Sequence, residues 1–151
     1  MATITPFLWF DDRIEEAVTL YASVFKDAKI TSRTPGPNGT VMSMTFELEG
    51  QEFMALNGGP QFKFTEAVSF FVKCQTQSEV DHHWNALTAN GGHENRCGWL
   101  KDPYGLSWQI VPTALGRYLS DPDRAKAQRV MQAMMQMRKI DIAALDKAHA
   151  G

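Results

Sequence analysis

Hydrophobic and polar positions alternate most regularly between residues 42 and 48. The apolar positions are Met42, Met44, Phe46 and Leu48, and the polar positions between them are Ser43, Thr45 and Glu47. Successive side chains of a strand point to opposite faces, so this period of two predicts a half-buried strand. Gly50-Gln51 is predicted to form a two-residue hairpin turn of type II′, after which residues 52–56 return as the partner strand.

Two other segments place apolar residues at helical spacing. In the first they are Ile14, Ala17, Val18, Tyr21 and Val24 or Phe25, and in the second Val80, Trp84 and Leu87. Each segment begins with a capping-box pattern, Asp12 with Glu15 and Thr76 with Glu79. We therefore predict two amphipathic helices that start near residues 12 and 76.

Shorter apolar runs predict the remaining strands. They cover residues 4–10, 29–34, 67–74, 93–96, 97–101 and 106–111. A strand, a helix and three strands thus occur twice, in a first βαβββ module at 3–59 and a second at 67–112. Neither module buries both faces of its sheet alone. We expect an α+β fold in which the two modules pair, with the helices outside and the open sheet faces forming a cup for a small ligand.

The C-terminal residues 120–149 have the pattern of a helical extension. Ser120-Asp121-Pro122-Asp123 has the cap and early proline of a helix start, and Asp141 is placed to cap a final short helix. The apolar stripe between them is rich in methionine: Ala127, Val130, Met131, Met134 and Met137 or Arg138. This stripe predicts packing on the sheet or on a partner subunit. The alternative is a flexible lid, since methionine surfaces repack easily.

Composition and charge exclude several classes of function. A net charge of -2 over 151 residues leaves no basic field for nucleic acid or an anionic membrane. No apolar run reaches the roughly 18 residues that a membrane helix needs, and residues 1–10 lack the pattern of a signal peptide. We expect a cytoplasmic protein in which both cysteines, Cys74 and Cys97, are reduced.

Four segments, in order along the chain, resemble one protein family. They are TPFLWFDDRIEEAVTLYASVF, MALNGGPQFKF, CGWLKDPYGLSWQIVP and QRVMQAMMQMRKIDIAAL. They are similar to the PhnB-like branch of the vicinal oxygen chelate superfamily, the glyoxalase/bleomycin resistance/dioxygenase group, whose members often carry the name demethylubiquinone methyltransferase. The resemblance implies paired βαβββ modules and a homodimer. It implies either an enzyme, such as a glyoxalase, a dioxygenase or a transferase, or a metal-free protein that sequesters a small molecule.

The same resemblance implies four positions that hold a divalent metal in the superfamily's enzymes. They fall at or near Thr5, Leu56 or Asn57, Ala67 and Gln109. None of these residues is a histidine or a carboxylate, and a metal ion needs such ligands to offset its desolvation. The histidines lie elsewhere, at positions 82, 83, 93 and 149, and fraying is expected at His149. We therefore predict that the metal site is absent and that no other cofactor is bound.

The candidate ligand contacts are residues on the strand sides that should face the cup. They are Thr5, Phe7, Trp9, Ala67, Ser69, Phe71, Trp99, Ser107 and Gln109, with Asn57 added as a residue that either bonds a ligand or shapes its turn. Aromatic side chains at such positions stack on flat ligands, and core packing is the alternative for the tryptophans. Trp108 points to the other side of the last strand, so we expect it in the core.

Two residues are candidates for catalysis. Glu47 is a candidate general base if it is buried in the cup, and Cys97 is a candidate nucleophile, although buried cysteine usually acts as a small hydrophobe. A common S-adenosylmethionine site needs a glycine-rich turn between a strand and a helix, and neither Gly58-Gly59 nor Gly91-Gly92 has that setting. We expect a metal-free small-molecule-binding dimer. The alternatives are an enzyme of the same fold that uses Glu47, Gln109 or Cys97, and a purely partner-binding role of the tail.

Overall fold

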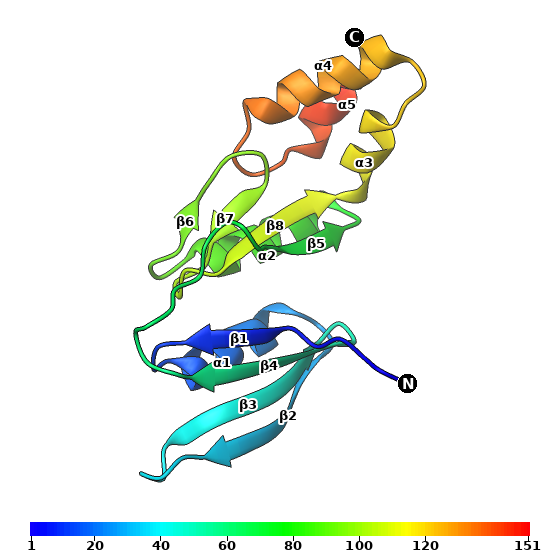
Figure 1. The fold of residues 1–151 in the computed structure, drawn as a ribbon. Coiled ribbons are helices and arrows are strands. Elements are labelled where there is room, and N and C mark those ends of the chain that lie inside the picture. The colour runs from blue at the N-terminus through cyan, green and yellow to red at the C-terminus, as the bar shows by residue number, and fades with distance from the viewer. The chain divides into compact units, whose positions relative to one another are not determined.

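The computed structural model describes residues 1–151, which separate into two compact units, residues 1–64 and 65–151. Each unit contains one four-stranded mixed sheet (Figure 1). The element order is strand, helix and three strands in both units, as predicted, and three helices follow in the second unit. The fold is thus α+β with a C-terminal helical extension. None of the helices combines the length and the apolar content that crossing a bilayer requires.

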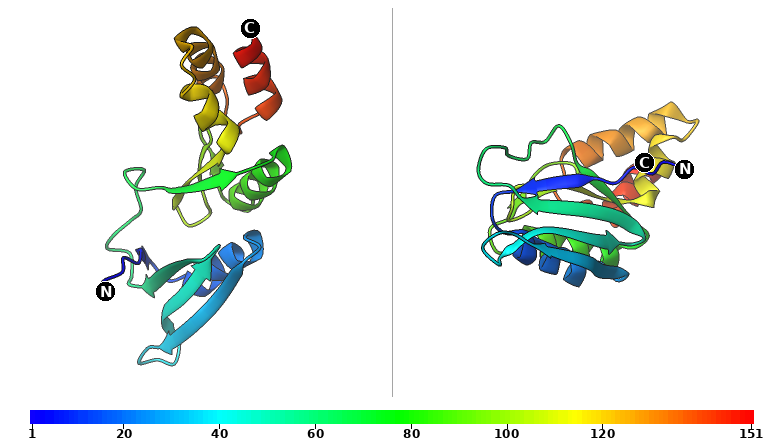
Figure 2. Two further views of the ribbon diagram at one scale, coloured as in Figure 1. Left: turned by 90° about the vertical axis from the view of Figure 1, so that its right-hand side faces the viewer. Right: turned by 60° about the horizontal axis from the view of Figure 1, so that its bottom comes forward.

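The first unit is a sheet with a helix against one face (Figure 2). Its elements are β1 (Phe7–Phe10), α1 (Ile14–Val24), β2 (Ala28–Pro35), β3 (Val41–Leu48) and β4 (Gln51–Asn57). The strand order is β1-β4-β3-β2, with β1 parallel to β4 and the other neighbours antiparallel. The predicted strand at 4–10 begins only at Phe7. Pro6 precedes it and has no N–H group to donate to a sheet ladder.

The core of the first unit lies between α1 and the helix-facing side of the sheet. The buried residues of α1 are those predicted from helical spacing: Ile14, Ala17, Val18, Tyr21 and Val24. The alternation in β3 is confirmed for Met44, Phe46 and Leu48, which are buried, whereas Met42, predicted on the same side, is exposed. Phe46 stacks on both Tyr21 and Phe53, with ring centroids 6.3 and 5.3 Å apart. Burial of these regularly spaced apolar side chains makes this face the core side of the sheet.

The start of α1 differs from the prediction. The helix begins at Ile14, and Arg13 at the N-cap position makes no side-chain capping bond, so the capping box of Asp12 and Glu15 does not form. The side chain of Asn57, at the end of β4, replaces it. Its Oδ1 accepts a hydrogen bond from the Ile14 N–H at 3.0 Å, and its Nδ2 donates to the Val41 carbonyl at 3.1 Å. One amide therefore connects the helix start to two strands.

Replacing Asn57 with alanine should lower the free energy of unfolding of the first unit by about 2 kcal/mol, because a helix cap and a second hydrogen bond are lost together. The measurement is urea unfolding followed through the NMR signal of the Trp9 indole. Asn38→Ala, in the exposed loop between β2 and β3, is the control and should change stability by less than about 0.5 kcal/mol. Equal effects of the two substitutions would contradict this role of Asn57.

The hairpin between β3 and β4 turns one residue earlier than predicted. Leu48 pairs with Gln51, so the turn residues are Glu49 and Gly50, with φ of 50° and 84°. Two positive φ values are typical of a type I′ turn, not of the predicted type II′. Glu49 is held in this conformation by its carboxylate, whose Oε2 accepts hydrogen bonds from the Lys26 and Asp27 N–H groups at 3.0 and 3.3 Å.

The second unit repeats the arrangement and adds helices. Its elements are β5 (Phe70–Cys74), α2 (Gln77–Thr88), β6 (His93–Glu94), β7 (Trp99–Lys101), β8 (Ser107–Pro112), α3 (Thr113–Leu119), α4 (Arg124–Met135) and α5 (Ile142–Ala150). The strand order is β5-β8-β7-β6, with β5 parallel to β8. The predicted cap of α2 is confirmed, since Thr76 Oγ1 accepts from the Glu79 N–H at 3.2 Å. Val80, Trp84 and Leu87 are buried, as is Trp108.

The strands of the second unit are shorter than predicted. The segment 67–74 becomes a strand only at Phe70, where pairing with Trp108 begins, and residues 66–68 form a turn and bend. Val68, which precedes the strand, is exposed. The runs at 93–96 and 97–101 are reduced to β6 and β7, because Cys97 and Gly98 between them have positive φ. A strand ends where its partner ends, and an apolar run does not show where that is.

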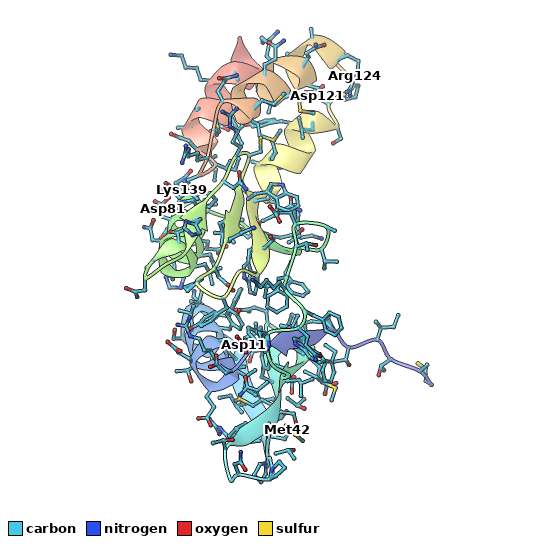
Figure 3. The ribbon with its side chains drawn as sticks, turned by 60° about the vertical axis from the view of Figure 1, so that its left-hand side comes forward. Asp11, Met42, Asp81, Asp121, Arg124 and Lys139 are labelled. Atoms are coloured by element: carbon cyan, nitrogen blue, oxygen red, sulfur yellow. The ribbon has the colours of Figure 1, made fainter.

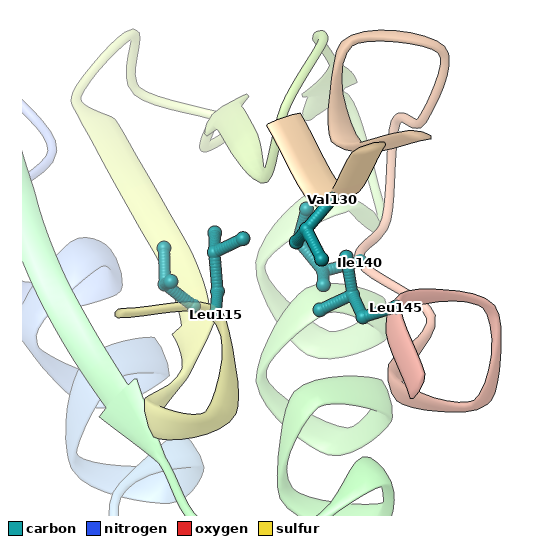
Figure 4. Close-up of a cluster of buried hydrophobic side chains, with 5 residues drawn as sticks. Leu115, Val130, Ile140 and Leu145 are labelled. Atoms are coloured by element: carbon teal, nitrogen blue, oxygen red, sulfur yellow. The ribbon is translucent and has the colours of Figure 1, made fainter. Parts of the chain in front are cut away.

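The tail begins with a helix that the sequence analysis did not anticipate. α3 directly follows Pro112, which is its N-cap residue. The next helix starts at Arg124, with Asp123 as the cap that accepts from Ala125 and Lys126. The cap thus lies at the end of the predicted start at Ser120-Asp121-Pro122-Asp123, and Pro122 precedes the helix where it was expected at its first position. Asp141 caps α5 as predicted. A buried cluster connects these helices to β8 (Figure 4): Val111, Leu115, Val130, Ile140 and Leu145.

Polar contacts connect the segment between α4 and α5 to the rest of the second unit. The N–H groups of Cys97 and Gly98 donate to the carbonyls of Met137 and Arg138, both at 2.8 Å. Gln77 of α2 donates to the Ile140 carbonyl at 3.0 Å. Asp81, also on α2, forms an ion pair with Lys139 at 2.9 Å, and the two side chains lie side by side in Figure 3. The tail is thereby part of the compact second unit.

Candidate functional site

The open face of the second sheet, on the side away from α2, carries a row of three predicted residues. Gln109 of β8 pairs in register with Phe71 of β5 and with Trp99 of β7, so two aromatic side chains flank one amide. Gln109 Nε2 donates to Ser69 Oγ at 3.0 Å. Phe71 is 52% exposed, whereas Trp99 and Gln109 are partly buried. An amide held between aromatic rings suits the orientation of a flat ligand.

A buried carboxylate determines where β8 begins and so which residues face outward. Asp102 Oδ1 accepts hydrogen bonds from the Tyr104 and Leu106 N–H groups at 2.9 and 3.0 Å, and Oδ2 accepts from Trp108 Nε1 at 3.0 Å. Asp102 is only 1% exposed. Trp108 is therefore anchored on the side of α2. Because side chains alternate along a strand, Ser107 and Gln109 point to the open face.

The open face of the first sheet is apolar along β1 and β4 and polar along β3, where Ser43, Thr45 and Glu47 lie. Its exposed or partly buried side chains include Phe7, Trp9, Met54 and Leu56. Trp9 lies close against Gly58, where an added Cβ would come within 2.3 Å of the ring, and its Nε1 donates to the Gly59 carbonyl at 3.0 Å. Phe62 packs edge-on against Trp9, with centroids 5.0 Å apart. The segment Asn57-Gly58-Gly59 thus holds the Trp9 ring against this face of the sheet.

The polar candidates of the first unit have protein partners. Thr5, which lies before β1 and not within it, donates to Glu52 Oε1 at 2.9 Å. Both polar atoms of Asn57 are used in its contacts with Ile14 and Val41. Glu47 is on the open side of β3, but its side chain is 32% exposed and pairs with Lys29 at 3.5 Å. Glu47 is thus only partly buried, and its role as a general base stays a prediction.

The two cysteines are free thiols in different settings. Cys74 is fully buried, and burial, with a smaller contribution from the Glu79 charge, raises the pKa of its thiol to about 12. This thiol stays protonated near neutral pH and is a poor nucleophile. Cys97 has a φ of 59°, and its N–H group binds the tail. The structure therefore gives the backbone of Cys97 a defined role, and reactivity of its thiol stays a prediction.

His149 is not frayed, contrary to expectation. Its ring stacks on Tyr118 with centroids 4.3 Å apart, and Nε2 lies 2.7 Å from Asp121 Oδ2. The hydrogen bond to His149 lowers the pKa of the Asp121 carboxyl. Tyr118 in turn donates a hydrogen bond to Asp146 of α5. These contacts fasten the end of the chain to α3.

The residues at the implied metal positions do not fit a divalent metal ion. Thr5 supplies a hydroxyl, Gln109 a neutral amide already bonded to Ser69, and Ala67, exposed in the turn before β5, no donor atom. No group of three or more His, Cys, Asp and Glu side chains in the structure is arranged to hold a metal. Neutral oxygen donors alone do not offset the loss of a cation's hydration shell.

Sequence reasoning missed two charged residues, Lys101 and Glu66, beside the open face of the second sheet. Lys101 has the same parity on β7 as Trp99 and pairs in register with Ser107. Its Nζ lies 3.2 Å from Glu66 Oε1 in the turn before β5. Parity places Lys101 on the same side as Trp99, since it follows Trp99 by two residues, and the β7–β8 register makes it a neighbour of Ser107. Glu66 has no such signal, because it lies outside the strands.

Comparison with known proteins finds a matching family and similar structures. The model of the 3-demethylubiquinone-9 3-methyltransferase family matches residues 2–111. The PhnB protein from Bacillus cereus is 35% identical, with a TM-score of 0.68, over 74% of this chain and 99% of that chain. No curated protein sequence matches the chain.

Two structures of the fosfomycin resistance protein FosX from Listeria monocytogenes share the fold at low identity. One is 13% identical, with a TM-score of 0.58, over 80% of this chain and 98% of that chain. The other, in complex with Mn(II) and sulfate, is 15% identical, with a TM-score of 0.51, over 72% and 89%. The chain belongs to the 3-demethylubiquinone-9 3-methyltransferase family, the PhnB-like branch of the vicinal oxygen chelate superfamily.

Proposed function

We propose that the protein is a cytoplasmic, metal-independent homodimer that binds a flat aromatic or amphipathic small molecule on the open face of its second sheet. The observation that carries this proposal is the row formed by Phe71, Gln109 and Trp99. Aromatic rings supply stacking area, and the amide supplies direction.

The chemistry of the face favours binding over the metal-assisted reactions of the superfamily. FosX is complexed with Mn(II) in one structure, whereas this chain has Thr5, Ala67 and Gln109 at implied ligand positions. The methyltransferase name of the family would require a glycine-rich turn that binds S-adenosylmethionine between a strand and a helix, and the chain offers no such turn. The connections from strand to helix, residues 11–13 and 75–76, contain no glycine that would let the sugar of S-adenosylmethionine approach the backbone.

The test is a titration of the purified full chain with 2-naphthol, followed by quenching of tryptophan fluorescence and by thermal shift, with EDTA or added MnCl2. We expect saturable binding that EDTA leaves unchanged. Phe71→Ala should weaken binding about tenfold, because a stacking surface is removed. Met135→Ala on α4 is the matched control, since Phe71 and Met135 are 52% and 53% exposed, and it should leave binding unchanged.

Ligand binding, metal independence and the dimer each have an outcome that contradicts them. Absence of saturable binding removes the ligand-binding function. Binding or turnover that requires Mn(II) contradicts metal independence and favours an enzyme of the same fold. Light scattering of the full chain tests the dimer, and a monomer at micromolar concentration would remove it from the proposal.

A further inference from the structure

Ser107 is a buried polar residue that the fold itself does not explain. Its side chain lies on the open face of β8, two residues before Gln109, and the residue is 1% exposed. Its Oγ is buried and has no hydrogen-bond partner. Burying a hydroxyl without a partner is unfavourable, and most buried polar atoms in proteins are paired. An unpaired hydroxyl beside a binding face is therefore best explained by a group that arrives with the ligand.

An ion pair lies beside this serine and connects the two neighbouring strands. Lys101 stands opposite Ser107 on β7, and Glu66 precedes β5, the strand on the other side of β8. Their charged atoms are 3.2 Å apart, with the side chains 33% and 56% exposed. The Lys101 ammonium lowers the pKa of the Glu66 carboxyl. A pair this exposed contributes little stability, so an incoming oxyanion can replace Glu66 at small cost.

We propose that Lys101 and Ser107 form an oxyanion subsite of the ligand-binding face, in which Lys101 is paired with Glu66 in the free protein, so that the ligand is an aromatic acid. The ammonium supplies a point charge and the hydroxyl supplies a hydrogen-bond donor, a combination suited to a carboxylate or phosphonate oxygen. Two residues of strand, roughly 7 Å, separate Ser107 from Gln109. A ring between Phe71 and Trp99 can therefore carry its acidic group to Lys101. This inference rests on the function proposed above.

The test compares 2-naphthoate with 2-naphthol, which share a ring system and differ in the acidic group. We expect 2-naphthoate to bind the wild-type protein about tenfold more tightly, as a charge-assisted hydrogen bond allows. Lys101→Met should remove this preference and leave 2-naphthol binding unchanged. Lys73→Met is the matched control. It removes a cation from the same face at a position paired with Val111, four residues along β8 from Ser107, and should preserve the preference.

Two further variants test the subsite without relying on Lys101→Met. Glu66→Gln removes the competing carboxylate and should tighten 2-naphthoate binding at least threefold. Ser107→Ala should weaken 2-naphthoate about fivefold, while removal of the unpaired hydroxyl should raise the Tm of the free protein by about 3 °C. Equal affinities for the two ligands, or equal losses in Lys101→Met and Lys73→Met, overturn the subsite while the proposed function stands. Failure of both ligands to bind overturns the proposed function and the subsite with it.

Discussion

Asp102→Ala should lower the free energy of unfolding of the second unit by about 4 kcal/mol, the largest effect we expect from a single substitution. The carboxylate is buried and accepts three hydrogen bonds, from the backbone of Tyr104 and Leu106 and from the indole of Trp108. Removing it takes the carboxylate acceptor from three donors, of which the Leu106 N–H and the Trp108 indole are buried and the Tyr104 N–H is partly buried. A buried donor that loses its acceptor costs about 1–3 kcal/mol before the site relaxes. Urea unfolding, followed through the NMR signals of the tryptophan indoles, measures the effect in each unit.

Asp123→Ala is the control for Asp102→Ala. Asp123 also accepts backbone hydrogen bonds, from Ala125 and Lys126, but at the exposed start of α4. Water replaces those bonds, so we expect a loss of only about 1 kcal/mol, typical of a helix cap. The Trp9 signal of the first unit should keep its midpoint in both variants. A loss for Asp102→Ala no larger than that for Asp123→Ala would show that burial of this network contributes nothing.

Leu145→Ala should destabilise the second unit by about 3 kcal/mol. Leu145 is fully buried in the cluster with Val130 and Ile140, so truncation removes apolar contacts and leaves a cavity. The same urea experiment applies, with Met131→Ala as control. Met131 is 41% exposed on α4 and should cost less than about 1 kcal/mol. Similar small effects of both substitutions would show that the tail is not integral to the core of the second unit.

Much of the fold follows from hydrophobic periodicity. The buried faces of α1 and α2 and the inward side of β3 are the ones that spacing predicts, because burial of apolar area is the dominant favourable term in folding. The element order was predictable for the same reason. The boundaries were not. β5 begins where β8 becomes available as a partner, and α1 begins where the distant Asn57 supplies an acceptor. Neither partner is visible in local sequence.

Local conformation explains two further failures. The shift of the β3–β4 turn to Glu49 and Gly50 depends on the carboxylate of Glu49 reaching backbone N–H groups that precede β2. Nothing in the residue type favours a positive φ there. α3 went unpredicted because Gly116 lies within it and Pro112 directly before it. Both residues are usual at helix ends, yet here the proline is the N-cap residue and the helix continues through the glycine.

The candidate site was predictable in part. Parity along β8 is enough to place Ser107 and Gln109 on one side of a sheet, whereas placing Trp99 beside Gln109 needs the β7–β8 register. It does not reveal that Ser69 binds Gln109, because that contact depends on the parallel register between β5 and β8. Residues outside strands have no parity, so Ala67 and Thr5 were assigned a side that the structure does not define for them.

At one edge of each sheet, a parallel pair joins two strands that are far apart in sequence. This pairing has a consequence during synthesis on the ribosome. Phe7 pairs with Met54, which is 47 residues further along the chain. At an elongation rate of about 5–20 residues per second, the segment that becomes β1 waits roughly 2–9 s for its partner. During that interval the nascent chain presents an unpaired, aromatic stretch, which is the kind of segment that ribosome-associated chaperones bind.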